Sequence, residues 1–188
     1  MLSFLLWVDQ LLFTTINQGA SNVVFDAVMP IVTKLQWWLP VFVLGIGWLV
    51  VRGGKTGRQC ALLVLAAVAV ADPITNRLIK PLVARERPCR QLPQVILRIP
   101  CADGPSFPSS HAVNMAAVAT VVSAFYRRGR WLWWFAALLV GFSRIYVGVH
   151  FPFDVISGWI GGIVFGMLTV KAIQKSAALL QKRRLRWW

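Results

Sequence analysis

The chain has 188 residues, of which 57% are hydrophobic, and its mean hydropathy is +0.64. This apolar content exceeds what a soluble core of that size can bury, so the composition excludes an ordinary soluble domain and predicts a membrane protein. The 20 Lys and Arg against 6 Asp and Glu give a formal charge of +14. Because most basic residues lie between apolar segments and form no single stripe, we expect them to contact lipid head groups and no nucleic acid.

Residues 1–36 are apolar but interrupted by polar or helix-breaking residues such as Asp9, Asn17, Asp26 and Pro30. We interpret this segment as short helices that lie in the outer membrane interface. The alternative is a sixth span, which would move the N-terminus to the cytoplasm. We expect no cleaved signal peptide, because the apolar start lacks a positive leading region and a small-residue cleavage site.

Five apolar stretches follow, and each meets or approaches the roughly 20 residues that a membrane-crossing helix needs. They are Trp37–Val51, Cys60–Ile79, Ser110–Tyr126, Trp131–Val149 and Pro152–Ile173. The predicted fold class is therefore all-α: a polytopic membrane helix bundle of five to six transmembrane helices, with N-terminal interfacial helices. Because no internal repeat or low-complexity linker divides the chain, we expect one domain.

The basic connections orient these spans. Lys and Arg gather in Arg52–Gln59, in Arg127–Arg130 and in the tail 174–188, and the positive-inside rule places these segments in the cytoplasm. Five alternating spans then bring the long Pro81–Ser109 loop and the His150–Phe151 corner to the opposite face.

Three motifs collect charged residues on that opposite face: KPLVARERP at Lys80–Pro88, FPSSH at Phe107–His111 and SRIYVGVHFPFD at Ser143–Asp154. Each has an ordinary structural interpretation when it is taken alone, because flanking cations extend toward the interface and a carboxylate often stabilises the first turn of a helix. However, both histidines of the chain lie on this one face beside arginines. Such a group suits a phosphate.

We predict that cations and helix N–H groups bind the phosphate. Lys80 and Arg87 lie two turns apart if the helix continues, and Arg144 adds a guanidinium that matches phosphate oxygens. Ser109 and Ser110 open an apolar helix, where free N–H groups and the helix dipole favour an anion. The reaction needs no metal on this interpretation, because the side chains supply the positive charge.

The histidines predict the reaction. Asp154 follows His150 by four residues, so its carboxylate can accept the proton of one ring nitrogen and leave the other nitrogen nucleophilic. His111 would protonate the leaving oxygen as general acid. The predicted reaction is in-line phosphoryl transfer to His150, followed by hydrolysis of the phosphohistidine by water.

The three motifs together resemble the pattern of the type 2 phosphatidic acid phosphatase family, which comprises membrane lipid phosphatases. That pattern is Lys, six residues, Arg-Pro; then Pro-Ser-Gly-His; then Ser-Arg, five residues, His, three residues, Asp. The matching residues are Lys80, Arg87 and Pro88; Pro108, Ser109 and His111; and Ser143, Arg144, His150 and Asp154. Ser110 stands where the pattern has glycine, so the N–H is kept and the freedom at positive φ is lost.

The resemblance implies that His150 is the nucleophile, Asp154 its partner and His111 the acid, with the other polar residues as phosphate ligands. It also implies a site similar to that of vanadium-dependent haloperoxidases, so vanadate should inhibit. We therefore predict a lipid phosphatase, without a cofactor, at the outer face of a bacterial inner membrane. A lipid phosphotransferase that uses the same residues and a non-catalytic transporter of anionic lipids are the alternatives.

The substrate stays open among four lipids: undecaprenyl diphosphate, phosphatidylglycerophosphate, phosphatidic acid and lipid A 1-phosphate. We place undecaprenyl diphosphate slightly ahead. The sequence also leaves the role of Asp72 open, because this residue could pair with Arg77 or contact the substrate.

The cysteines are expected to have structural roles. Cys89 and Cys101 both lie in the Pro81–Ser109 loop, which we call the outer loop and which we expect in an oxidising compartment. We predict a disulfide between them. Cys60 lies in an apolar run and is expected to pack there, and the Cys and His residues show no zinc-ligand spacing.

The last span and the tail contain patterns that bear on helix packing and on membrane attachment. Gly158, Gly162 and Gly166 recur every four residues, which favours close packing within the bundle over a homodimer contact, so we expect a monomer or a weak homodimer. The end of the tail, Lys182–Trp188, is typical of a membrane-surface anchor.

Overall fold

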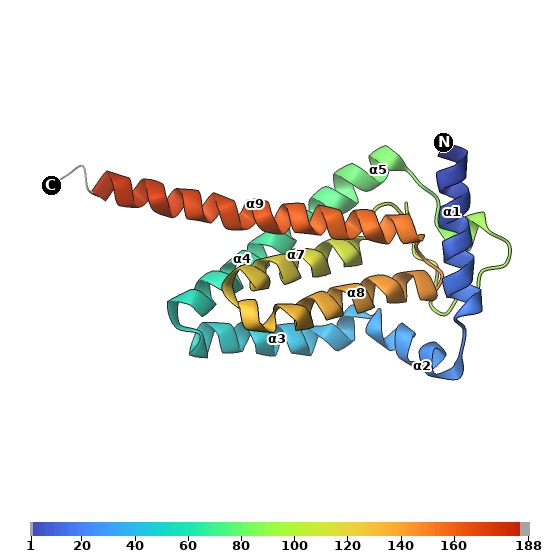
Figure 1. The fold of residues 1–188 in the computed structure, drawn as a ribbon, viewed down its shortest axis with the longest axis horizontal. Helices are drawn as coiled ribbons and strands as arrows, with labels where there is room; N and C mark the ends of the chain where they lie inside the picture. Colours follow the sequence, from blue (N-terminus) through green and yellow to red (C-terminus); the bar gives the residue numbers. More distant parts are fainter. Residues whose placement is uncertain (1, 185–188) are drawn as a thin grey trace.

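A computed structural model describes the backbone of residues 2–184 and the side chains of residues 3–175. Within these residues all regular secondary structure is helical and no β-strand occurs, which confirms the predicted all-α class. The anchor predicted at Lys182–Trp188 lies outside the described side chains. Figure 1 shows the longer helices side by side, with the last described turns of α9 at one end of the bundle and α1 at the other.

The elements follow one another with short connections, except for the loop before α7. In chain order they are α1 (Leu2–Thr14), η1 (Thr15–Gly19), α2 (Val23–Val32), α3 (Leu35–Arg52), α4 (Gly54–Pro73), η2 (Ile74–Ile79), α5 (Lys80–Val83), α6 (Pro88–Gln91), α7 (Ser110–Phe125), η3 (Arg127–Gly129), α8 (Arg130–Tyr146) and α9 (Pro152–Arg184). Because α4, η2 and α5 are consecutive, the second predicted span continues to Val83.

Three described stretches are long and apolar enough to cross a membrane by themselves: Leu35–Arg52, Gly54–Gln91, which comprises α4 to α6, and Pro152–Lys175. The helices α7 and α8, which the sequence also predicts to cross, have 16 and 17 residues. They run beside the longer helices (Figure 1), and most of α7 is buried because α4, α8 and α9 pack around it. Protein therefore takes the place of lipid around α7.

The fourth predicted span ends earlier than expected, at Tyr146 in place of Val149. Gly148 adopts a left-handed conformation with φ of 91°, which ends the helical path. A Cβ atom on Gly148 would also lie 3.0 Å from the carbonyl oxygen of Ile96. The chain therefore turns here and presents His150 before Pro152 starts α9.

Three glycines let α9 approach α7 closely. A Cβ atom would lie 2.8 Å from the Ser109 carbonyl oxygen if it were added to Gly158, and 2.2 Å from that of Val113 if added to Gly162. On Gly166 it would lie 2.7 Å from Cβ of Thr120. The glycine stripe therefore packs within the bundle, as predicted.

The N-terminal segment covers the end of the bundle opposite the last described turns of α9. There α1 lies across the ends of the long helices, as an interfacial helix would (Figure 1), and it exposes apolar side chains such as Phe4 and Trp7. The buried Asn17 side chain donates hydrogen bonds to the carbonyl oxygens of Ile96 and Tyr146, at 2.9 and 2.8 Å. The segment is therefore tied both to the outer loop and to the end of α8.

The outer loop meets the turn after α8 at this same end. A disulfide joins Cys89 to Cys101, and the N–H of Arg98 donates to the carbonyl oxygen of Val147 at 3.2 Å. Cys60 is a free, fully buried thiol that packs with apolar side chains of α4 and α7. The loop is therefore fastened next to the corner that carries His150.

Candidate active site

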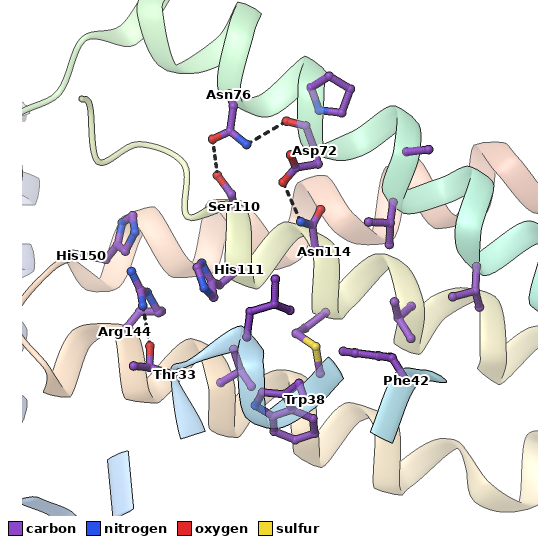
Figure 2. Close-up of a pocket in the computed structure, with 18 of the residues that line it drawn as sticks. Thr33, Trp38, Phe42, Asp72, Asn76, Ser110, His111, Asn114, Arg144 and His150 are labelled. Carbon is purple, nitrogen blue, oxygen red and sulfur yellow. Dashed lines mark hydrogen bonds between the residues drawn. The ribbon is translucent and has the colours of Figure 1, made fainter. Parts of the chain in front are cut away.

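A cavity of about 710 Å³ opens between α3, α4, α7 and α8 and ends against the outer loop. One end is polar and contains Lys80, Arg87, Ser110, His111, Arg144 and His150. The rest is mainly apolar and includes Trp38, Phe42, Ile46, Val64, Val68, Met115, Val118 and Val140. Figure 2 shows the rings of His150 and His111 near Arg144, with Trp38 and Phe42 farther along the cavity. Such a cavity suits a ligand with an anionic head and an apolar tail.

His150 lies at the polar end between two charged neighbours. Its Nε2 is 3.2 Å from Nη1 of Arg87, and its Nδ1 is 3.5 Å from Oδ2 of Asp154, which is ion-pair range but longer than a good hydrogen bond. An arginine N–H only donates, so Nε2 must be the unprotonated acceptor and Nδ1 carries the proton. The nitrogen that carries a lone pair therefore lies on the side of Arg87, and the N–H lies toward Asp154.

Arg87 is almost fully buried and is held by the loop. Its guanidinium donates to the carbonyl oxygens of Gly104, Pro105 and Val149, at 3.1, 3.3 and 3.1 Å. The main chain thereby fixes this positive charge beside Nε2 of His150.

The side chain of Arg144 is held by a residue of the N-terminal segment and not by the outer loop. Its Nη1 donates to the hydroxyl of Thr33 at 2.5 Å, and its buried Nε has no partner in the described part of the chain. Thr33 follows α2, so the N-terminal segment positions this arginine. Sequence reasoning missed Thr33, because no local pattern links it to a residue more than a hundred positions away.

Of the two serines before His111, only Ser110 lines the cavity. Its hydroxyl donates to Oδ1 of Asn76 at 2.8 Å. Ser109 is fully buried, is absent from the lining, and donates its N–H to the main-chain oxygen of Asp154 at 2.9 Å. The N–H of Ser109 is therefore engaged by the chain, contrary to the expectation of a free donor.

Asp72 bonds across to α7. Its Oδ1 accepts from Nδ2 of Asn114 at 2.8 Å, and no ion pair with Arg77 occurs among the described residues, so that predicted alternative is wrong. Figure 2 shows Asp72 and Asn114 on the same side of the cavity as Ser110 and Asn76. Asn114 could have been found in the sequence as a polar residue one helical turn after Ser110.

The surroundings of His150 disfavour the charged form of its ring. Burial, together with the positive charges of Arg144, Arg87 and Lys80, lowers the pKa of its imidazole well below the ordinary value of 6.5. A neutral ring keeps its lone pair at neutral pH, as a nucleophile requires. Among the described residues, no group of three His, Cys, Asp or Glu side chains is placed to hold a metal ion.

The structure therefore brings Lys80, Arg87, Ser110, His111, Arg144 and His150 to one cavity. Asp154 lies behind His150, and Ser109 lies next to Asp154 under the start of α7. The ring of His111 makes no hydrogen bond within the described part of the chain, so both of its nitrogens are available to a ligand.

Known proteins resemble this chain in sequence and in fold. The chain is 28% identical over 181 residues to a lipid A 4'-phosphatase of Porphyromonas gingivalis, which covers 90% of this chain and 75% of that protein. It is 31% identical over 147 residues to undecaprenyl-diphosphatase BcrC of Bacillus subtilis, covering 78% and 74%. The crystal structure of Aquifex aeolicus LpxE superposes with a TM-score of 0.73 at 28% identity, covering 85% of this chain and 93% of that one.

The family-level comparison includes all three motifs. The sequence profile of the PAP2 superfamily matches residues 61–178, a range that contains Lys80 and Asp154 and every motif residue between them. The chain is therefore a membrane protein of the PAP2 superfamily.

Proposed function

We propose that the protein is a membrane lipid phosphatase, which removes a phosphate from a lipid phosphate or diphosphate. The observation that carries this proposal is the single cavity, which has two histidines and three cations at one end and apolar side chains along the rest. A phosphate head group can bind at the polar end while the first part of its hydrocarbon tail lies among Trp38, Phe42 and Val118. The named relatives that act on lipid A and on undecaprenyl diphosphate support the same class of substrate.

In the proposed reaction Nε2 of His150 attacks the phosphorus atom. A bond forms between Nε2 and phosphorus while the bond from phosphorus to the leaving oxygen breaks, and His111 donates a proton to that oxygen. The ring of His150 keeps its proton on Nδ1 and gains positive charge, which the carboxylate of Asp154 stabilises. Water then attacks phosphorus, His111 accepts a proton from it, and inorganic phosphate leaves His150.

The cations have separate roles in this proposal. Lys80 and Arg144 lie at the cavity without a carboxylate partner among the described ion pairs, so they are free to bind the nonbridging oxygens. Arg87 is fixed by the loop beside Nε2, where it would stabilise the charge that develops during attack. With these three positive charges at the phosphate, we propose that the reaction proceeds without a metal ion.

We further propose that the site faces the periplasm of a bacterial inner membrane. The basic connections at Arg52–Lys55 and Arg127–Arg130 lie at the end of the bundle away from α1, and the positive-inside rule favours the cytoplasm for them. The disulfide in the outer loop supports an oxidising compartment on the side of the site.

Phosphate release from purified protein in detergent tests the function. The four candidate lipids are assayed with wild type and with His150→Ala, in the presence of EDTA and with or without vanadate. We expect release from at least one lipid that survives EDTA, is inhibited by vanadate and is lost in His150→Ala, because the nucleophile is gone. A ³²P label on the protein that is stable to alkali and labile to acid would identify the phosphohistidine.

Other outcomes would contradict the proposal. Binding of these lipids by folded protein without release would favour a transporter, and appearance of a phosphorylated acceptor lipid without free phosphate would favour a phosphotransferase. Asp103→Asn is a suitable control variant, because this carboxylate is fully exposed to solvent, which screens its charge, and its one ion pair among the described residues is with Arg90 in the outer loop. Its activity should equal that of wild type.

A further inference from the structure

Behind His150, an arginine joins two buried carboxylates from distant parts of the chain. Arg85 donates from Nη1 to Oδ1 of Asp154 at 2.8 Å and from Nη2 to Oδ2 of Asp9 at 2.6 Å. Both carboxylate side chains are 0% exposed, and that of Arg85 is 18% exposed. Neither Asp9 nor Arg85 belongs to the residues that line the cavity, so neither can contact the phosphate.

The other carboxylate oxygens bind the turn that starts α9. Oδ1 of Asp9 accepts from the N–H of Phe153 at 2.8 Å, and Oδ2 of Asp154 accepts from the N–H of Phe151 at 2.9 Å. The guanidinium of Arg85 also lies over the ring of Phe151, 4.2 Å from its centre. Every carboxylate oxygen of Asp9 and Asp154 therefore has a donor, which determines how both groups are oriented.

These contacts orient the carboxylate of Asp154 toward the ring of His150. Its Oδ2 is the oxygen that faces Nδ1 of His150, at 3.5 Å, while its Oδ1 is held from behind by Arg85. Two carboxylates share one guanidinium, so the cluster of Asp9, Arg85 and Asp154 has one net negative charge when both carboxylates are ionised. That charge faces the ring that becomes positive when His150 binds phosphorus.

We propose that Asp9 and Arg85 are positioning residues for the nucleophile. They hold the carboxylate of Asp154 ionised and in place, and thereby orient the imidazole of His150 for attack. This inference rests on the proposed function. It gives the N-terminal helix α1 a role in the reaction, although Asp9 precedes the residues matched by the family profile and Arg85 lies between the matched motif positions.

A purely structural role is the alternative, in which the same contacts only fasten α1 to the bundle. The two roles differ in what they change. A positioning residue should change kcat with little effect on KM, because it acts on the attacking atom and not on substrate binding. In Asp9→Asn the amide oxygen can still accept from the N–H of Phe153, so this variant loses the ion pair with Arg85, and its effect should not multiply with that of Arg85→Gln.

The test uses the full chain with phosphatidic acid in mixed micelles, or the fastest lipid of the panel. The variants are Asp9→Asn, Arg85→Gln and the two combined. Control variants are Asp103→Asn and Arg90→Gln, an exposed pair at 2.8 Å in the outer loop. We expect kcat to fall about tenfold in Asp9→Asn and on the order of a hundredfold in Arg85→Gln, the usual range for residues that orient a reacting group.

The positioning role also predicts the KM values and the kcat of the double variant. KM should stay within about twofold of wild type, and the double variant should be no slower than Arg85→Gln alone. Arg85→Lys keeps the positive charge but cannot bridge both carboxylates as a planar fork, so its kcat should lie between those of wild type and Arg85→Gln. This variant decides the question if Asp9→Asn fails to fold.

Several results would overturn the inference: wild-type kcat in Asp9→Asn, losses that appear mainly in KM, or single effects that multiply in the double variant. Its failure is distinguishable from failure of the proposed function. No phosphate release by wild type from any lipid would contradict the function itself. Release that depends on His150 but is unchanged in Asp9→Asn and Arg85→Gln would contradict only the positioning role.

Discussion

At the scale of single residues, His150 combines two properties that a nucleophile needs. Its Nδ1 proton faces Asp154 and its Nε2 lone pair faces Arg87, so the tautomer is determined by unlike neighbours on opposite sides of the ring. Burial and three nearby cations lower the pKa of the ring and so favour its neutral form. In the proposed reaction the cations favour the free lone pair before attack, and the bound phosphate neutralises part of their charge, which makes the imidazolium formed by attack less unfavourable.

The protonation of His150 can be measured without an activity assay. The chain has two histidines, so ¹⁵N-histidine labelling should give two sets of ring signals, of which one disappears in His150→Ala. Because its pKa is lowered, we expect the His150 ring to remain neutral as the pH falls through 6.5. In Arg144→Gln the titration should move to higher pH, since one positive neighbour is lost. A midpoint at or above 6.5 in wild type would contradict this account.

At the scale of elements, the contact between α7 and α9 brings the second and third motifs together. α7 starts with Ser110 and His111, and α9 starts next to His150 and contains Asp154 in its first turn. The N–H of Ser109 donates to the main-chain oxygen of Asp154, so the two helix starts are joined directly. The glycines of α9 allow this approach, because small residues let helices pack closely where lipid provides no hydrophobic drive.

Two neighbouring glycines test that packing. A Cβ on Gly162 would lie 2.2 Å from the carbonyl oxygen of Val113, whereas on Gly161 the nearest atom is a methyl of Val113 at 3.9 Å. We expect Gly162→Ala to lower the free energy of unfolding by about 1–3 kcal/mol, as overpacking does. Gly161→Ala should change it by no more than about 0.5 kcal/mol. Denaturant titration in detergent measures both, and equal effects would contradict the close contact.

At the scale of the whole molecule, the fold connects a charged site to the apolar interior of the bundle. The N-terminal segment, the outer loop and the turn after α8 converge at one end (Figure 1). The cavity extends from there between α3, α4, α7 and α8, and Figure 2 shows part of its lining. The cations and the aromatic side chains line one continuous cavity. This continuity is what a substrate that remains partly in the membrane requires.

Narrowing the apolar part of the cavity should separate lipid substrates by chain length. Val68 lines the cavity, whereas Leu62 on the same helix is 60% exposed and does not. We expect Val68→Trp to lower kcat/KM at least about tenfold for dioleoyl phosphatidic acid, because the indole occupies the space of the tail. Activity on dibutyryl phosphatidic acid should be nearly unchanged, and Leu62→Trp should behave as wild type. A parallel loss on both lipids in Val68→Trp would indicate a general folding defect.

The sequence by itself determined the helical class, the approximate helix bounds and the residues of the polar end of the cavity, because hydropathy and motif spacing are local properties. It also placed the loop and the His150 corner on one face, through the alternation of spans. Only the tertiary structure decided which groups contact one another: Thr33 with Arg144, Asn114 in place of Arg77 with Asp72, and Arg85 between Asp9 and Asp154. These contacts join residues far apart in the chain, and whether a polar side chain finds a given partner depends on how the helices pack, which no local pattern records.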